Sequence, residues 1–170
     1  LRSTGHSVID VGMVDTSFLY FAINHLDCVG GVMVTASHNP ANYNGFKISG
    51  PKAKPIGSAS GLDDIKRITS TLRVGNTGLN GDYMEMDLWK AYRLHVLSFL
   101  NLGRKMRVVV DASNGMAGKM VPAVFGGIDN LEIIPLLFEI TGSFVHEPNP
   151  LVDSNLDMLK AKIKEEKPDL

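Results

Sequence analysis

The residues best suited to covalent chemistry in this 170-residue chain lie between positions 35 and 47. The hydroxyl of Ser37 comes soon after the apolar run 32–34 and directly before His38. Pro40 restricts the residue before it to extended geometry and removes a backbone donor, so the chain is not expected to continue into a helix. The pattern predicts a buried strand that ends in a tight loop, with Ser37 at the mouth of a sheet.

A serine in this position could carry a phosphoryl group. Phosphorylation of Ser37 would add about two negative charges and several strong hydrogen-bond acceptors. Phosphoryl transfer depends mainly on positioning and on neutralising charge, so cations and oriented N–H donors are needed nearby. His38, Lys47 and the amides of the loop are the local candidates, and Lys47 also suits a role in proton transfer.

Two other interpretations of the same residues remain. Ser37 and Asn39 could simply form hydrogen bonds within their own loop, as serine and asparagine often do in turns. A serine hydrolase that uses Ser37 and His38 is disfavoured, because adjacent side chains on an extended chain point to opposite sides. The Gly-x-Ser-x-Gly pattern of many such hydrolases is also absent from the sequence.

The full string favours phosphoryl transfer. Residues 35–40 (TASHNP) and 43–48 (YNGFKI) closely resemble the active-site signature of the α-D-phosphohexomutases, the phosphomannomutase/phosphoglucomutase family. The resemblance implies that Ser37 is phosphorylated in the resting enzyme, that His38 lies near the reacting phosphate, and that Lys47 helps proton transfer to and from the sugar hydroxyl. It further implies interconversion of hexose 1-phosphate and hexose 6-phosphate through a hexose 1,6-bisphosphate, with hexose phosphate as the partner.

The same resemblance implies a Mg²⁺ ion bound by an oxygen of phosphorylated Ser37 and by three aspartates of a loop expected after Leu170. Because the chain begins with Leu1 rather than Met, we interpret it as a fragment, and we expect the fragment alone to be inactive or nearly so. A non-catalytic module that binds sugar phosphates is the alternative function. We do not expect metal binding by His146 and Glu147, because adjacent side chains on an extended chain point apart.

The overall composition is that of an ordinary globular protein, with a net charge of −1 and a hydrophobic fraction of 44%. A charge near zero gives no support for broad binding to nucleic acid or anionic membranes. No apolar run approaches the ~20 residues of a membrane-spanning helix. The single cysteine, Cys28, is interpreted as a buried structural thiol and suggests a reducing, cytoplasmic location. The oligomeric state stays open.

The order of strands and helices predicts an α/β fold with two incomplete three-layer units and mixed, mostly parallel sheets. Residues 1–102 would form the C-terminal part of the family's domain 1, and residues 103–170 the N-terminal part of its domain 2. We expect strands at 8–11, 32–34, 46–48, 108–110 and 131–135, and helices at 18–26, 62–72, 86–102, 116–125 and 156–167.

Three connecting segments have expected roles. The basic run 104–107 is interpreted as a solvated linker between the two units. The Gly-rich turn 111–118 is expected to serve packing, because it lacks the glycine and lysine spacing of a phosphate-binding loop. Pro122 is expected to lie early in its helix or to break it. Pro168 would begin one more strand.

Overall fold

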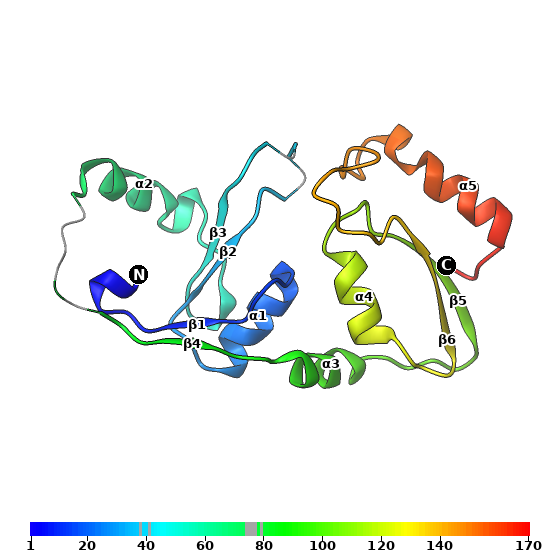
Figure 1. Cartoon of the computed structure of the whole chain (residues 1–170), viewed down its shortest axis with the longest axis horizontal. Coiled ribbons are helices and arrows are strands. Elements are labelled where there is room, and N and C mark those ends of the chain that lie inside the picture. The colour runs from blue at the N-terminus through cyan, green and yellow to red at the C-terminus, as the bar shows by residue number, and fades with distance from the viewer. Residues whose placement is uncertain (38, 41, 74–77, 79) are drawn as a thin grey trace. The chain divides into compact units, whose positions relative to one another are not determined.

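The computed structural model describes residues 1–37, 39–40, 42–73, 78 and 80–170. These residues form two compact units (Figure 1). The first comprises Leu1–Met33 with Phe46–Leu88, and the second comprises Val34–Gly45 with Trp89–Leu170. Both contain helices and small sheets, so the expected mixed α/β class is confirmed.

The elements of the described residues are short. The helices are α1 (Thr16–His25), α2 (Leu62–Thr71), α3 (Trp89–Leu97), α4 (Ala117–Phe125) and α5 (Asp157–Glu166). The strands are β1 (Val8–Asp10), β2 (Gly31–Val34), β3 (Phe46–Ser49), β4 (Tyr83–Glu85), β5 (Met106–Asp111) and β6 (Leu131–Leu136). β1 pairs with β4 and β5 with β6, both in parallel, and β2 pairs with β3. Two parallel pairs agree with the mostly parallel sheets expected from the sequence.

Helix α1 forms the centre of the first unit. The side chain of Asp15 accepts a 2.8 Å hydrogen bond from the backbone N–H of Phe18, which caps the helix at its N-terminus. Phe18 is fully buried, and Ala22 and Ile23 are buried about one turn further along. The helix predicted at 18–26 is therefore confirmed, although it begins earlier, at Thr16.

Strand β2 lies where the sequence predicts it, but the expectation that it is buried was wrong. A Cβ atom on Gly31 would lie 2.7 Å from Cδ1 of Ile23, so the strand packs closely on α1 at this residue. Val32 and Val34, by contrast, are 42% and 60% exposed. In a two-stranded sheet one face can pack on a helix while alternate side chains point away from it.

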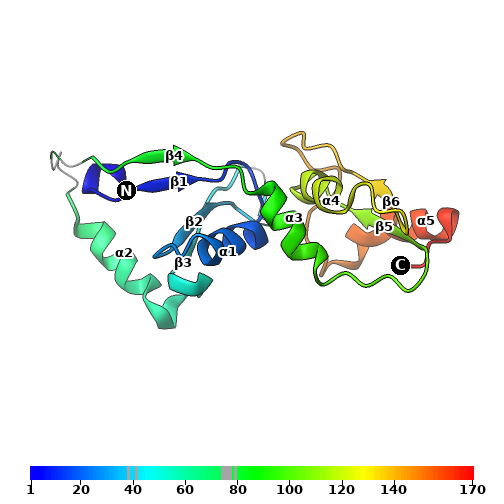
Figure 2. The same cartoon turned by 90° about the horizontal axis from the view of Figure 1, so that it is seen from below.

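The pairing of β1 with β4 was not predicted. The two strands run side by side in both views (Figure 2). Met86 donates its backbone N–H to the carbonyl of Asp10, so the chain stays extended through residue 86. Helix α3 consequently begins only at Trp89 and ends at Leu97, and the expectation of a helix over 86–102 was too long at both ends.

The second unit is organised around β5 and β6, which pair in parallel from Met106 and Leu131 to Asp111 and Leu136. Helix α4 connects the two strands, as parallel pairing requires. Pro122 lies inside α4 and neither begins nor breaks it, so the expectation for this proline was wrong.

Side chains of α3 pack on α4. The Arg93 guanidinium donates hydrogen bonds to the carbonyl oxygens of Ala123 (3.1 Å) and Gly126 (2.9 Å), near the C-terminus of α4. The Lys119 ammonium lies 5.3 Å from the ring centre of Trp89. The boundary between family domains that the sequence indicates after residue 102 stays a prediction.

The C-terminal residues form backbone hydrogen bonds with β5. Asp169 donates its N–H to the Arg107 carbonyl (2.8 Å), and Val109 donates to the Leu170 carbonyl (2.9 Å). The chain after Pro168 is thus hydrogen-bonded to β5, a contact that was not predicted, but it forms no strand of its own. The interpretation of residues 104–107 as a solvated linker was wrong for Met106 and Arg107, which belong to β5.

Arg107 connects three elements of the second unit. Its guanidinium lies 3.3 Å from a carboxylate oxygen of Glu132 on β6 and 3.2 Å from one of Glu166 on α5. A basic side chain on a strand can reach acidic side chains on neighbouring elements, and the run of basic residues in the sequence does not reveal such partners.

Among the described helices, none has the length and apolar character needed to cross a membrane.

Candidate functional site

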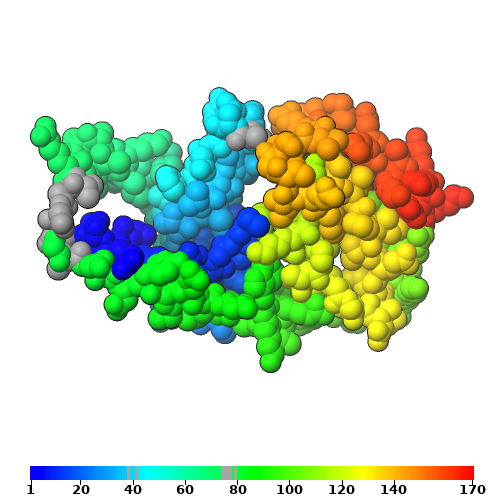
Figure 3. Space-filling view, in the orientation of Figure 1, coloured from blue at the N-terminus to red at the C-terminus, as the bar shows by residue number. Residues whose placement is uncertain are grey.

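The predicted serine loop joins β2 to β3, and its base is closed by a backbone hydrogen bond. The N–H of Thr35 donates to the carbonyl of Gly45 at 2.9 Å. Ser37 lies two residues into the loop from this bond, and Lys47 lies two residues into β3. The segment is at the surface of the molecule in the space-filling view (Figure 3). Ser37 therefore lies in the loop after β2, and Lys47 lies on β3, the strand that follows this loop.

Ser37 has an unusual backbone conformation. Its φ is +55°, in the left-handed region that residues other than glycine rarely adopt. The backbone N–H of Ser37 donates a 3.0 Å hydrogen bond to Oγ1 of Thr35. A left-handed residue costs about 1–3 kcal/mol unless its surroundings fix it, and such residues cluster at functional sites. Thr35 thus positions the exposed Ser37, a role that the sequence analysis missed although Thr-x-Ser is a known turn pattern.

Several N–H groups of the loop donate hydrogen bonds to acceptors within the loop itself. Asn39 donates both its backbone N–H (3.1 Å) and its side-chain amide (2.8 Å) to the carbonyl of Ala36. The N–H of Tyr43 donates to the carbonyl of Pro40, and the N–H of Gly45 donates to the side chain of Asn44. The two asparagines therefore do shape the loop.

These internal bonds change the expectation about phosphate binding. The sequence analysis counted the loop amides as donors for a phosphoryl group, but those of Ser37, Asn39, Tyr43 and Gly45 already have acceptors in the loop. Side-chain cations are therefore the better candidates to neutralise a phosphate at Ser37. Lys47 is exposed on β3. His38, the third predicted site residue, lies outside the described residues.

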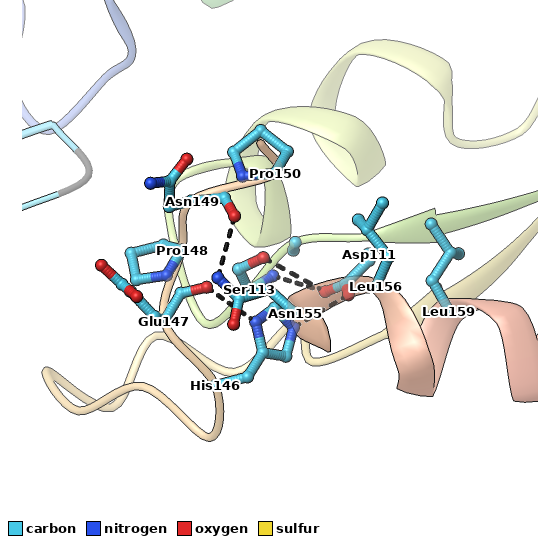
Figure 4. Close-up of a pocket in the computed structure, with 11 residues that line it drawn as sticks. Asp111, Ser113, His146, Glu147, Pro148, Asn149, Pro150, Asn155, Leu156 and Leu159 are labelled. Carbon is cyan, nitrogen blue, oxygen red and sulfur yellow. Dashed lines mark hydrogen bonds and ion pairs between the residues drawn. The ribbon is translucent and has the colours of Figure 1, made fainter. Parts of the chain in front are cut away.

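A second cluster of polar residues lies in the second unit, where β5 ends. Nε2 of His146 is 3.0 Å from Oδ2 of Asp111, and Nδ1 is 3.0 Å from the carbonyl oxygen of Glu147 (Figure 4). The side chains of His146 and Asp111 are only 14% and 7% exposed. The sequence analysis expected no metal binding by His146 and Glu147, and it did not anticipate that His146 would pair with Asp111.

A cavity of ≈ 340 Å³ adjoins this pair. Its lining combines polar side chains from the segment after β6 with apolar ones from the start of α5. The lining residues are Asp111, Ala112, Ser113, His146, Glu147, Pro148, Asn149, Pro150, Asn155, Leu156 and Leu159. In open α/β sheets, ligands commonly bind beyond the carboxyl ends of parallel strands, and Asp111 ends such a strand.

The contacts of His146 also favour its charged form. The hydrogen bond to the Glu147 carbonyl raises the pKa of the imidazole above its ordinary value, and the Asp111 carboxylate adds to this shift through a hydrogen bond and its charge. Partial burial acts in the opposite direction, but the net shift is upward.

The described residues do not form a complete magnesium site. In this part of the chain, no three acidic, histidine or cysteine side chains lie close enough to hold a metal ion. Mg²⁺ requires near-octahedral oxygen ligands, and a phosphate oxygen on Ser37 would supply only one. The role of phosphorylated Ser37 as one ligand of Mg²⁺ stays a prediction.

Two models of one protein family match this chain. A family model described as "Phosphoglucomutase/phosphomannomutase, alpha/beta/alpha domain I" matches residues 1–73, and the corresponding model of domain II matches residues 90–170. The chain belongs to the phosphoglucomutase/phosphomannomutase family.

Individual relatives agree with this assignment. A phosphomannomutase/phosphoglucomutase of Pseudomonas putida is 36% identical over 167 residues, which cover 97% of this chain and 35% of the relative. A phosphomannomutase of Salmonella montevideo is 33% identical over 179 residues, which cover 100% of this chain and 39% of the relative. The chain thus spans a little over a third of these relatives' length.

A solved structure shows the same fold. The crystal structure of a phosphoglucomutase/phosphomannomutase family protein from Burkholderia thailandensis superposes with a TM-score of 0.78 at 32% identity. The match covers 97% of this chain and 37% of that one.

Proposed function

We propose that this chain is the phosphoryl-carrying part of a phosphohexomutase that interconverts hexose 1-phosphate and hexose 6-phosphate. The observation that supports this most is the left-handed conformation of Ser37 on an exposed loop, held by Thr35. A residue that must present its hydroxyl to two positions of a sugar benefits from such fixed placement.

The proposed reaction has two matched halves. In the first, a sugar hydroxyl gives up its proton, its oxygen bonds to the phosphorus, and the bond between phosphorus and Ser37 Oγ breaks. The proton passes by way of Lys47 to the serine oxygen, and a hexose 1,6-bisphosphate results. After the sugar reorients, the other phosphate returns to Ser37 by the reverse of these steps. His38 is proposed to lie near the transferring group.

Charge neutralisation is the main demand of this reaction. Because several loop amides are engaged internally, we assign the nearby neutralising charge to Lys47. A phosphate oxygen on Ser37 is proposed as one ligand of Mg²⁺, with carboxylates from elsewhere in the protein completing its coordination. The ion would stabilise negative charge on the phosphoryl oxygens.

The substrate and the setting follow from the relatives. Those named above are phosphomannomutases or phosphoglucomutases, which favours glucose and mannose phosphates over other hexose phosphates. We expect the 170 residues alone to have little activity, because they correspond to a little over a third of those relatives. The half-buried Cys28 fits a reducing compartment such as the cytoplasm.

Mass spectrometry tests the proposal directly. We expect the protein, purified at its full natural length, to carry one phosphoryl group on the peptide that contains Ser37. Incubation with excess hexose phosphate should discharge that group. The Ser37→Ala variant should lose it, whereas Ser58→Ala, at an exposed serine outside the loop, should keep it. A Ser37 that is never phosphorylated, even after incubation with a hexose bisphosphate, would favour the non-catalytic binding module instead.

A further inference from the structure

The imidazole of His146 lies between two groups that accept hydrogen bonds. Nδ1 faces the carbonyl oxygen of Glu147 and Nε2 faces a carboxylate oxygen of Asp111, each at 3.0 Å. A carbonyl oxygen and an ionised carboxylate have no proton to donate. Both hydrogen bonds therefore form only when both ring nitrogens carry a proton, that is, when His146 is an imidazolium cation.

A neutral imidazole can make only one of the two contacts. If the remaining proton stays on Nδ1, the lone pair of Nε2 faces the carboxylate of Asp111, and if it moves to Nε2, the lone pair of Nδ1 faces the Glu147 carbonyl. Either arrangement places two acceptors 3.0 Å apart. Because His146 and Asp111 are mostly shielded from solvent, water compensates such a mismatch poorly.

We propose that protonation of His146 fastens the segment of residues 144–150 to the carboxyl end of β5, and that deprotonation loosens it. The segment has other attachments that do not titrate. Val145 donates its N–H to the Asn114 side chain (3.2 Å), and Asn155 donates to the carbonyl of Asn149 (2.9 Å). These two bonds hold the segment at Val145 and at Asn149, so the His146 contact controls the residues between them.

The charged neighbours of His146 support this assignment. Asp111 comes from β5, and Glu147 is the titratable residue of the segment itself that lines the cavity. From the stretch that enters α5, the cavity is lined by Asn155, Leu156 and Leu159, none of which titrates. The charge that acts on the ring is that of Asp111, and it stabilises the imidazolium cation.

The direction of the pH effect follows from these contacts. The pKa of His146 is raised in the folded protein, first by the Glu147 carbonyl and then by Asp111. The attachment is therefore complete below the ordinary histidine pKa of about 6.5 and is lost as the pH rises through the raised value. Because residues 146–150 line the ≈ 340 Å³ cavity, loosening them also changes the wall of that cavity.

Hydrogen exchange measured at several pH values tests whether protonation of His146 holds this segment in place. Exchange of the amides of residues 144–147 and 149 would be measured on the full-length protein from about pH 5.5 to about pH 8.5, corrected for the intrinsic change in rate. We expect protection to fall several-fold over this range in the wild type, and also in His95→Gln, which alters an exposed histidine of the same unit. His146→Gln should show low protection without this dependence. Protection that stays constant in the wild type would overturn the proposal.

Asp111→Asn distinguishes an effect of His146 protonation from an effect of side-chain packing. An asparagine amide can donate to the lone pair of Nε2, so the neutral imidazole would make both contacts. We expect this variant to keep the segment protected at high pH and to lower the pKa of His146. If the variant fails to fold, ¹⁵N resonances of the His146 ring in the wild type decide the matter. Two protonated nitrogens at about pH 6.5 support the proposal, and a neutral ring at that pH overturns it.

Discussion

Oγ1 of Thr35 accepts a 3.0 Å hydrogen bond from the backbone N–H of Ser37. The side chain of Thr35 therefore helps to fix the backbone of the proposed phosphoryl carrier. The φ of Ser37, +55°, would otherwise be costly for a serine. The hydroxyl of Thr35 and the conformation of Ser37 therefore form one device. We propose that they place Oγ of Ser37 for phosphoryl transfer.

Replacing Thr35 should lower activity without unfolding the protein. Thr35→Ala removes the acceptor for the Ser37 N–H, and we expect kcat/KM to fall about tenfold because the nucleophilic oxygen is less well placed. Thr35→Ser keeps the hydroxyl and should retain most of the activity. Mutase assays with both variants, together with urea unfolding, provide the measurement. Equal losses in the two variants would contradict the role assigned to the hydrogen bond.

Lys47 should be needed for its proton as well as for its charge. Lys47→Met removes both, and we expect kcat to fall about 100-fold or more. Lys47→Arg keeps the charge, but a guanidinium stays protonated at neutral pH, so this variant should also be strongly impaired. Steady-state kinetics compare the two. Full activity of Lys47→Arg would show that the charge alone matters and would remove the proposed proton transfer.

The C-terminal pairing on β5 should weaken in acid. The backbone N–H of Arg107 and then the guanidinium of Arg104 lower the pKa of Asp169 below its ordinary value. Because the pKa is depressed on folding, its contribution to stability is present above the ordinary value of about 3.9 and is lost as the pH falls through the lowered one.

Asp169→Asn should consequently lower the urea midpoint at neutral pH, and its difference from the wild type should shrink in strongly acid solution. Asp129→Asn, at an exposed turn of the same unit, is the matched control and should change the midpoint little. Urea unfolding at several pH values measures both. A difference for Asp169→Asn that is the same at all pH values would argue against a stabilising carboxylate.

Local patterns predicted much of the fold. The β-branched run of β5 and the Asp15 cap of α1 are local signals that indicate a strand and the start of a helix. Strand β4 could not be found in this way, because Tyr83–Glu85 is short, is exposed throughout, and is a strand only through its pairing with β1. The burial of β2 was also misjudged, since whether a second face is covered depends on the rest of the sheet rather than on residues 32–34.

The candidate site shows the same division. The sequence was enough to predict that Ser37 lies in a loop and Lys47 on the following strand, because both placements depend only on nearby residues. The left-handed φ of Ser37 depends on a hydrogen bond that composition does not reveal. The pairing of His146 with Asp111 joins residues 35 positions apart, so local sequence reasoning had no means to find it.

The most direct test of the central claim is the rate of hexose phosphate interconversion by Ser37→Ala in the full-length protein, measured beside the wild type and Ser58→Ala. We expect the loss of Ser37 to lower kcat by at least about 1,000-fold, because no hydroxyl remains to carry the phosphoryl group, whereas Ser58→Ala keeps its activity. A Ser37→Ala variant that interconverts the two hexose phosphates at the wild-type rate would contradict the account.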